Sequence, residues 1–151
     1  MPKRETDPDA SALDQATAML ARRRLSQLEL ESALGERGFD AAEIHEAMER
    51  LRDYGYLDDD ALAESIQHEA LRSVRGLRWV EQTFSRRGLK RANTYSEYEA
   101  LPQARALIRR RYGELAHRDA RTKARAYAFL ARRGFTPDFI RSAIDVDEVI
   151  D

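Results

Sequence analysis

The 151-residue chain contains no cysteine, which excludes disulfide bonds and thiolate metal sites. It also has no apolar run of about 18 residues, the length that an α-helix needs to cross a bilayer. The opening segment, MPKRETDPDASAL, is polar and lacks the apolar core of a secretory signal, so we expect a cytoplasmic protein. Lysine is scarce, and almost all of the cations are arginine.

Motifs of catalysis and nucleotide binding are absent as well. There is no GxxxxGK[ST] phosphate loop, no GxGxxG after a strand and no nucleophile elbow. The histidines, His45, His68 and His117, are isolated, with no second ligand at metal-binding spacing. The acidic run at 58–60 precedes an apolar helical stripe, which favours helix capping over Mg²⁺ binding. The sequence therefore predicts a protein that is not an enzyme and has no cofactor or metal.

Charge is divided unevenly along the chain, although the net charge is only −1. Residues 1–70 carry a balance of −9, residues 71–151 a balance of +8, and the stretch 71–141 alone a balance of +12. Such asymmetry indicates a polyanionic partner for the basic half. The alternative is that these charges are the solvated faces of ordinary helices.

Apolar residues recur at helical spacing throughout, and strand signals are nearly absent. Start signals punctuate the stripes: a capping box, SQLE, at 26–29, an acidic cap at Asp40, and Thr136 followed by Pro137. The sequence predicts an all-α fold with helices over 11–23, 26–36, 40–53, 59–74, 76–87, 91–101, 102–116, 119–133 and 136–146.

One short motif occurs three times, as LGERGF at 34–39, FSRRGL at 84–89 and LARRGF at 130–135. The glycines are 50 and 46 residues apart, and the residues four and eight before each glycine are apolar. This periodicity predicts three helical repeats that bury each other's apolar faces. We expect a flexible tail at 1–10 and repeats at 11–57, 58–101 and 102–151.

Each copy of the motif predicts the end of a helix. Gly38, Gly88 and Gly134 stand where a left-handed backbone is needed, which glycine adopts at little cost. The preceding arginine then faces the carbonyls of the last helical turn. In the middle repeat the pattern weakens around Thr94, where TYSE at 94–97 is a second candidate start for the helix over 91–101.

Eleven basic residues are the predicted contacts to a polyanionic partner such as nucleic acid, because arginine donates bidentately to phosphate and carboxylate groups. They are Arg72, Arg75 and Arg78 around Gly76; Arg86, Arg87, Lys90 and Arg91 around the second glycine turn; Arg105, Arg109 and Arg110 on the helix over 102–116; and Arg132.

Four residues have more than one interpretation. Arg111 is either a further basic contact or, since its stem shares an apolar stripe, a cover for the core. Arg132 and Arg133 serve either as helix-dipole partners or as contacts. Trp79 is expected in the core, with base stacking as the alternative.

These motifs resemble those of the RecX family of regulatory proteins. The resemblance rests on LGERGF and LARRGF, on GYLDDDALAES at 55–65, and on Gly76 followed by LRWVEQTFSRRGL, and it covers residues 12–146. It implies an elongated, curved array of three tandem three-helix repeats without catalytic residues.

The resemblance also implies a function in DNA recombination, DNA repair and the SOS response. The implied partners are RecA protein and the RecA–single-stranded DNA filament, with direct DNA binding in addition and no membrane. The implied effect is inhibition or modulation of RecA recombinase, ATPase and coprotease activity. Two other classes stay open: a helix-turn-helix DNA-binding regulator, since three-helix units with a glycine turn resemble that module, and a protein–protein scaffold.

Overall fold

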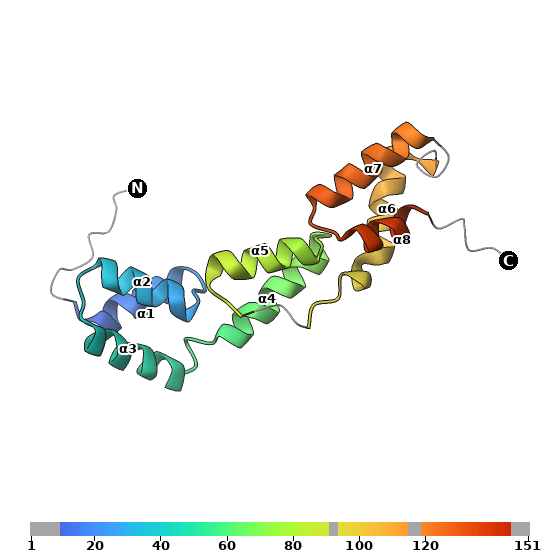
Figure 1. Ribbon diagram of the computed structural model, residues 1–151. Coiled ribbons are helices and arrows are strands. Elements are labelled where there is room, and N and C mark those ends of the chain that lie inside the picture. The colour runs from blue at the N-terminus through green and yellow to red at the C-terminus, as the bar shows by residue number, and fades with distance from the viewer. Residues whose placement is uncertain (1–9, 91–93, 115–118, 146–151) are drawn as a thin grey trace, which may run out of the picture. The chain divides into compact units, whose positions relative to one another are not determined.

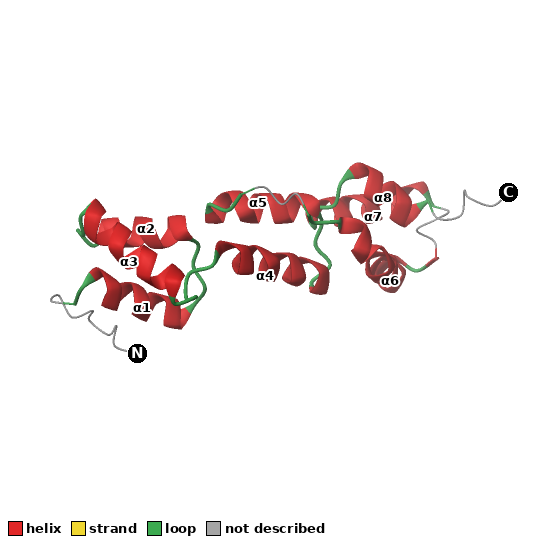
Figure 2. Cartoon of the chain, turned by 90° about the horizontal axis from the view of Figure 1, so that it is seen from below, coloured by secondary structure: helices red, strands yellow, loops and turns green. Residues whose placement is uncertain are grey.

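The computed structural model describes residues 10–90, 94–114 and 119–145. Within these ranges the chain consists of helices and loops only (Figures 1 and 2). The elements are α1 (Ala12–Arg22), α2 (Gln27–Glu36), α3 (Ala41–Asp53), α4 (Asp59–Arg72), α5 (Leu77–Arg87), a 3₁₀ helix η1 (Glu97–Ala100), α6 (Leu101–Tyr112), α7 (Ala120–Arg132) and α8 (Pro137–Ile144). The all-α fold class is confirmed, while the predicted tail lies outside the described residues except for Ala10.

The predicted start signals are confirmed at several helices. Ser26 and Glu29 form both halves of a capping box at α2, and the Asp40 carboxylate accepts from Glu43 N at 2.8 Å. The Asp58 carboxylate accepts from Ala61 N at 3.1 Å and so caps α4. The predicted capping role of the acidic run at 58–60 is therefore confirmed for its first residue, Asp58.

The described residues form two compact units. The first comprises residues 10–64 with 86–90, and the second comprises 65–85 with the described part of 94–145. The first core packs α1, α2 and α3 together around fully buried Leu30 and Leu34 of α2. Ala12, Ala16, Met48 and Leu51 surround these two leucines from α1 and α3.

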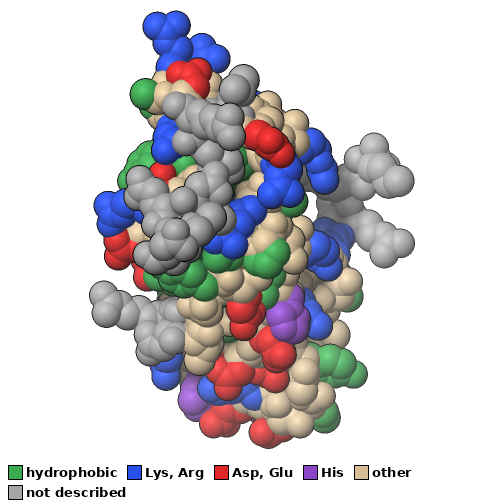
Figure 3. All heavy atoms as spheres, turned by 90° about the vertical axis from the view of Figure 1, so that its right-hand side faces the viewer, with side chains coloured by type: hydrophobic (Ala, Val, Ile, Leu, Met, Phe, Trp, Pro, Cys, Tyr) green, Lys and Arg blue, Asp and Glu red, His purple; other side chains and the backbone are tan. Residues whose placement is uncertain are grey.

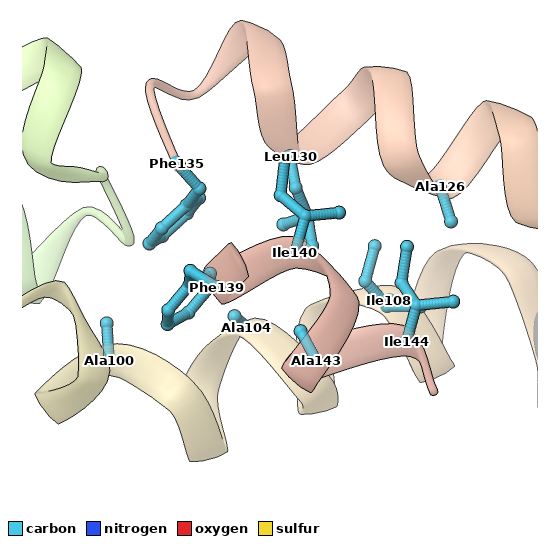
Figure 4. Packing of buried hydrophobic residues seen from close by; sticks show 10 residues of the cluster. All are labelled: Ala100, Ala104, Ile108, Ala126, Leu130, Phe135, Phe139, Ile140, Ala143 and Ile144. Atoms are coloured by element: carbon cyan, nitrogen blue, oxygen red, sulfur yellow. The ribbon is translucent and has the colours of Figure 1, made fainter. Parts of the chain in front are cut away.

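The core of the second unit lies between α6, α7 and α8 (Figure 4). Phe135 and Phe139 are fully buried and stack with ring centroids 4.3 Å apart and an interplanar angle of 11°. Leu130 of α7 and Ile140 of α8 close the core, and Ala104 lets α6 approach closely. Phe135, which directly follows the third glycine turn, folds back into the core as the motif predicts.

The helix predicted over 91–101 is wrong for the residues that the structure describes in this range. Residues 94–96 are not helical, and the chain then forms η1 and enters α6 at Leu101. Pro102 does not close a helix but lies in the first turn of α6, where its missing N–H costs nothing. The physical reason is that Tyr95 is buried against the Arg75 carbonyl before α5 and Glu97 against the N–H of Leu77 at the start of α5, so local helical preference yields to tertiary contacts.

Candidate functional site

The second arginine–glycine turn, at the end of α5, docks on the loop between α1 and α2 inside the first unit. The Arg87 guanidinium donates to the Glu29 carboxylate, with Nη2 to Oε1 at 3.0 Å and Nε to Oε1 at 3.2 Å. The same Nη2 donates to the Arg24 carbonyl at 2.8 Å. In return, the Ser26 hydroxyl donates to the Arg87 carbonyl at 2.5 Å. Arg87 therefore fastens the end of α5 to the start of α2.

The third turn makes an equivalent joint inside the second unit. The Arg133 guanidinium donates through Nε to the Val74 carbonyl at 2.9 Å and through Nη2 to the Ser73 carbonyl. Gly76 N donates to the Arg133 carbonyl at 3.0 Å, from the position that Ser26 occupies in the first repeat. The loop between α4 and α5 thus receives the end of α7 as the loop between α1 and α2 receives the end of α5.

The glycines of these two turns lie directly against the preceding repeat. A Cβ added at Gly88 would lie 2.4 Å from Leu28 Cδ2, and one at Gly134 would lie 2.5 Å from the Trp79 backbone nitrogen. The first copy has no such neighbour, since a Cβ at Gly38 would meet no atom within 4 Å. The motif is therefore a helix stop in all three copies and an inter-repeat joint in the second and third.

The sequence predicts that the arginine of each motif faces the carbonyls of its own helix. In the structure these arginines bind other parts of the chain instead. Arg37 donates to the Gln15 side chain of α1 at 2.8 Å, while Arg87 and Arg133 bind residues about 60 positions earlier. Spacing within one helix gives no signal for such distant partners. The joints form only in the folded chain, where residues of successive repeats come into contact.

An acidic side chain completes each joint. The Asp59 carboxylate, at the start of α4, accepts from Gln27 N at 2.9 Å, and the Glu97 carboxylate, at the start of η1, accepts from Leu77 N at 2.8 Å. Glu97 is only 4 % exposed and also accepts from the backbone N–H and hydroxyl of Thr136 at the start of α8. One buried carboxylate thus serves the N-termini of two helices, where the helix dipoles favour negative charge. The sequence predicts Glu97 only as part of a local cap, TYSE at 94–97.

The contacts at the joints shift the pKa values of three side chains. Burial opposes the charge on Glu29, but the Ser26 N–H and the guanidinium groups of Arg87 and Arg23 together hold the pKa of this carboxyl below its usual range. Burial, and to a lesser extent the nearby Arg75, lowers the pKa of Arg133. The Tyr95 hydroxyl donates to the Arg75 carbonyl at 2.6 Å, and burial with the charges of Glu97 and Glu99 raises its pKa to about 12.

Several of the eleven predicted contact residues are engaged inside the protein. Arg87 forms the joint already described, with a side chain that is 21 % exposed. Arg72 pairs with Glu69 on the surface of α4, and Arg105 donates to the Ser142 carbonyl at 3.1 Å. Arg75 is half-buried beside the second joint, and Arg91 lies outside the described residues.

The other predicted residues have exposed side chains that form no hydrogen bond or ion pair among the described residues. They are Arg78 at the start of α5, Arg86 and Lys90 at the first joint, Arg109 and Arg110 in the last turn of α6, and Arg132 in the last turn of α7. They belong to different elements, and the structure does not gather them into one cluster. In Figure 3, Lys and Arg side chains likewise occur at separate places on the face shown, among Asp and Glu side chains.

Pairing of α6 with α7 adds two cations that the sequence analysis did not select. The Tyr112 hydroxyl at the end of α6 donates to the Arg125 carbonyl of α7 at 3.5 Å, so this end of α6 lies beside the first turns of α7. Arg121 and Arg125 are exposed there, in the same unit as Arg109 and Arg110. We call these four residues the hairpin arginines; a charge count along α7 could have found the two missing members.

Arg111 and Trp79 have structural environments. The Arg111 guanidinium lies 4.7 Å from the centroid of the Phe129 ring, a cation–π contact that covers the core as expected. Trp79 is half-buried against the Gly134 turn. Within the described ranges, no three His, Asp or Glu side chains are placed to hold a metal ion, and no helix is long and apolar enough to cross a membrane.

Together these features define an all-helical tandem-repeat protein. Family models match residues 12–51 as the first three-helix domain of RecX and residues 97–144 as the third. A "Regulatory protein RecX" from Acidithiobacillus ferrooxidans (strain ATCC 53993 / BNL-5-31) is 35 % identical over 144 residues, with 95 % of this chain and 93 % of the relative covered. Another from Halorhodospira halophila is 34 % identical over 135 residues, covering 86 % and 84 % of the two chains.

A solved structure has the same fold. The crystal structure of RecX from Lactobacillus salivarius matches with a TM-score of 0.78 at 18 % identity, covering 92 % of this chain and 96 % of that one. The chain belongs to the RecX family of regulatory proteins.

Proposed function

We propose that this protein binds the RecA–single-stranded DNA filament in the cytoplasm and restrains RecA recombinase, ATPase and coprotease activity without catalysing a reaction. Membership of a family of regulatory proteins supports a regulator, and the family name supports a role connected with RecA. The observation that carries the contact surface is the set of exposed, unpaired arginines among the described residues. A filament offers DNA phosphates and acidic protein groups, and arginine binds both.

The hairpin arginines are the strongest part of this surface. Arg109 and Arg110 are exposed in the last turn of α6, with Arg121 and Arg125 at the adjoining end of α7. No described residue forms a hydrogen bond or ion pair with the side chains of Arg109, Arg110 and Arg121, and Arg125 has only the nearby charge of Asp119, so their donors remain available to a partner. Arg78, Arg86, Lys90 and Arg132 extend the proposed contact set along other elements.

Arg87 is left out of the proposed contact set. Its guanidinium is used by Glu29 and by the Arg24 carbonyl, so reversal of its charge would place two carboxylates together in a half-buried joint. A loss of function in an Arg87 variant would therefore report a damaged joint, not a lost contact.

A pull-down with three baits tests the proposal: RecA–single-stranded DNA filament, RecA without DNA, and random-sequence single-stranded DNA without RecA. We expect the filament to retain the protein best. Equal or better retention by DNA alone would favour a helix-turn-helix DNA-binding regulator. Failure to bind either RecA bait would refute the proposed function.

A further inference from the structure

Two tyrosines between α3 and α4 are unusually open to solvent. The segment of residues 53–60, DYGYLDDD, belongs to the first unit, and within it Tyr54 is 65 % and Tyr56 is 66 % exposed. Their ring centroids are 6.2 Å apart with an interplanar angle of 52°, so the two rings lie beside each other. Exposed paired rings of this kind mark interaction surfaces more often than isolated apolar residues do.

The residues around the tyrosines stabilise the turn through contacts that do not involve the two rings. Gly55 supplies a positive φ of 77°, and Leu57 is buried at 3 % exposure in the first core. Asp58 caps α4, and Asp59 accepts from the start of α2. Neither tyrosine hydroxyl forms a hydrogen bond among the described residues. The folding of the turn therefore does not explain why aromatic rings stand at these two positions.

The chemistry around the rings selects a cationic partner. Residues 53–60 carry four aspartates and no basic residue, and Asp53, Asp58 and Asp60 are exposed. The cations just before this segment have partners of their own: Arg50 pairs with Glu46 at 3.5 Å, and Arg52 donates to the Gln27 side chain at 3.4 Å. Aromatic faces attract guanidinium and ammonium groups, and carboxylates strengthen that attraction. The same carboxylates repel phosphate, which argues against nucleic acid as the occupant.

We propose that the Tyr54–Tyr56 pair and the three exposed aspartates form a docking site for an arginine- or lysine-bearing protein surface. The inference rests on the proposed function and assigns a separate partner to each surface. This acidic site binds the protein component of the filament, and the hairpin arginines bind phosphate. Tyrosine anchors of this kind carry a large share of the binding energy at protein interfaces.

The test compares the parent protein with the double variant Tyr54→Ala/Tyr56→Ala. We expect the double variant to keep its melting temperature, because the rings are exposed. It should bind RecA without DNA, and the RecA–DNA filament, about tenfold or more weakly, whereas its binding to single-stranded DNA alone should stay within about twofold. The variant Tyr54→Phe/Tyr56→Phe keeps the ring faces and should bind like the parent.

Tyr127→Ala is the matched control, since Tyr127 is an exposed tyrosine on α7 in the second unit, 39 % exposed. It should leave binding to RecA unchanged. Parent-like binding of RecA by the double alanine variant would overturn the inference and leave the proposed function standing. An equal loss of binding to DNA alone would also overturn it, because the rings would then contact nucleic acid. If the parent binds no RecA bait, the proposed function and the inference fail together.

Discussion

Gly38, Gly88 and Gly134 occupy the same place in their repeats but have different surroundings. All three have positive φ, at 89°, 70° and 90°. A side chain at Gly38 would point into open space, whereas one at Gly88 would press on the Leu28 side chain and one at Gly134 on the Trp79 backbone. A side chain yields more easily than backbone, so the three sites rank in a definite order.

Alanine at each site tests that order by urea denaturation. Gly38→Ala should cost about 1 kcal/mol, which is the penalty for a left-handed alanine. Gly88→Ala should add about 1–3 kcal/mol of overpacking, and Gly134→Ala should cost most. Equal losses at all three sites would contradict the assignment of the second and third turns as joints.

Glu29 links the first joint to pH. Its pKa is lowered from the ordinary value of 4.5, so the ionised form stabilises the fold above that pH, and the stabilisation is lost as the pH falls through the lowered value. Glu29→Gln should destabilise the protein at pH 7, and the difference in unfolding free energy should shrink steadily below about pH 4.5. Denaturation curves between pH 3 and 7 measure this, and a difference independent of pH would contradict the account.

At the scale of elements, most helices were predictable because their signals are local. Ser26 with Glu29, Asp40 and Pro137 lie at helix starts, and the three glycines end helices, so the predicted and observed bounds agree closely. The helix over 91–101 failed because Tyr95 and Glu97 obtain distant partners that no local pattern encodes. The basic residues were visible in sequence, but the internal binding of Arg87 was not, since Glu29 lies 58 residues away.

Glu97 connects η1 to the starts of α5 and α8, and its removal tests that connection. Glu97→Ala leaves the half-buried N–H groups of Leu77 and Thr136 without their acceptor, at a cost of about 2–4 kcal/mol. Amide protection from hydrogen exchange should fall more in α8 than in α3, which has its own cap at Asp40. Glu99→Ala, at an exposed position, should change stability by less than about 0.5 kcal/mol. Unchanged protection in α8 would show that the carboxylate is dispensable.

At the scale of the whole molecule, the division of charge corresponds to two kinds of surface. The acidic first part of the sequence carries the exposed tyrosine pair, and the basic second part carries the hairpin arginines. A filament of protein and DNA has chemistry that suits both surfaces. A direct measurement with RecA tests the arginine surface.

Inhibition of RecA-catalysed strand exchange and ATP hydrolysis by the variant Arg109→Glu/Arg110→Glu is that measurement. Its matched control is Arg22→Glu/Arg24→Glu, which reverses two exposed arginines at the C-terminal end of α1 and makes the same change in net charge. The parent and the control should inhibit RecA at similar concentrations, whereas the α6 variant should need about tenfold more protein. Where phosphates are contacted, the salt dependence of binding should also flatten by about 0.7–0.9 in log–log slope for each lost contact. Inhibition by the α6 variant at the parent's concentration would contradict the proposed arginine surface, and absence of inhibition by the parent would contradict the proposed function itself.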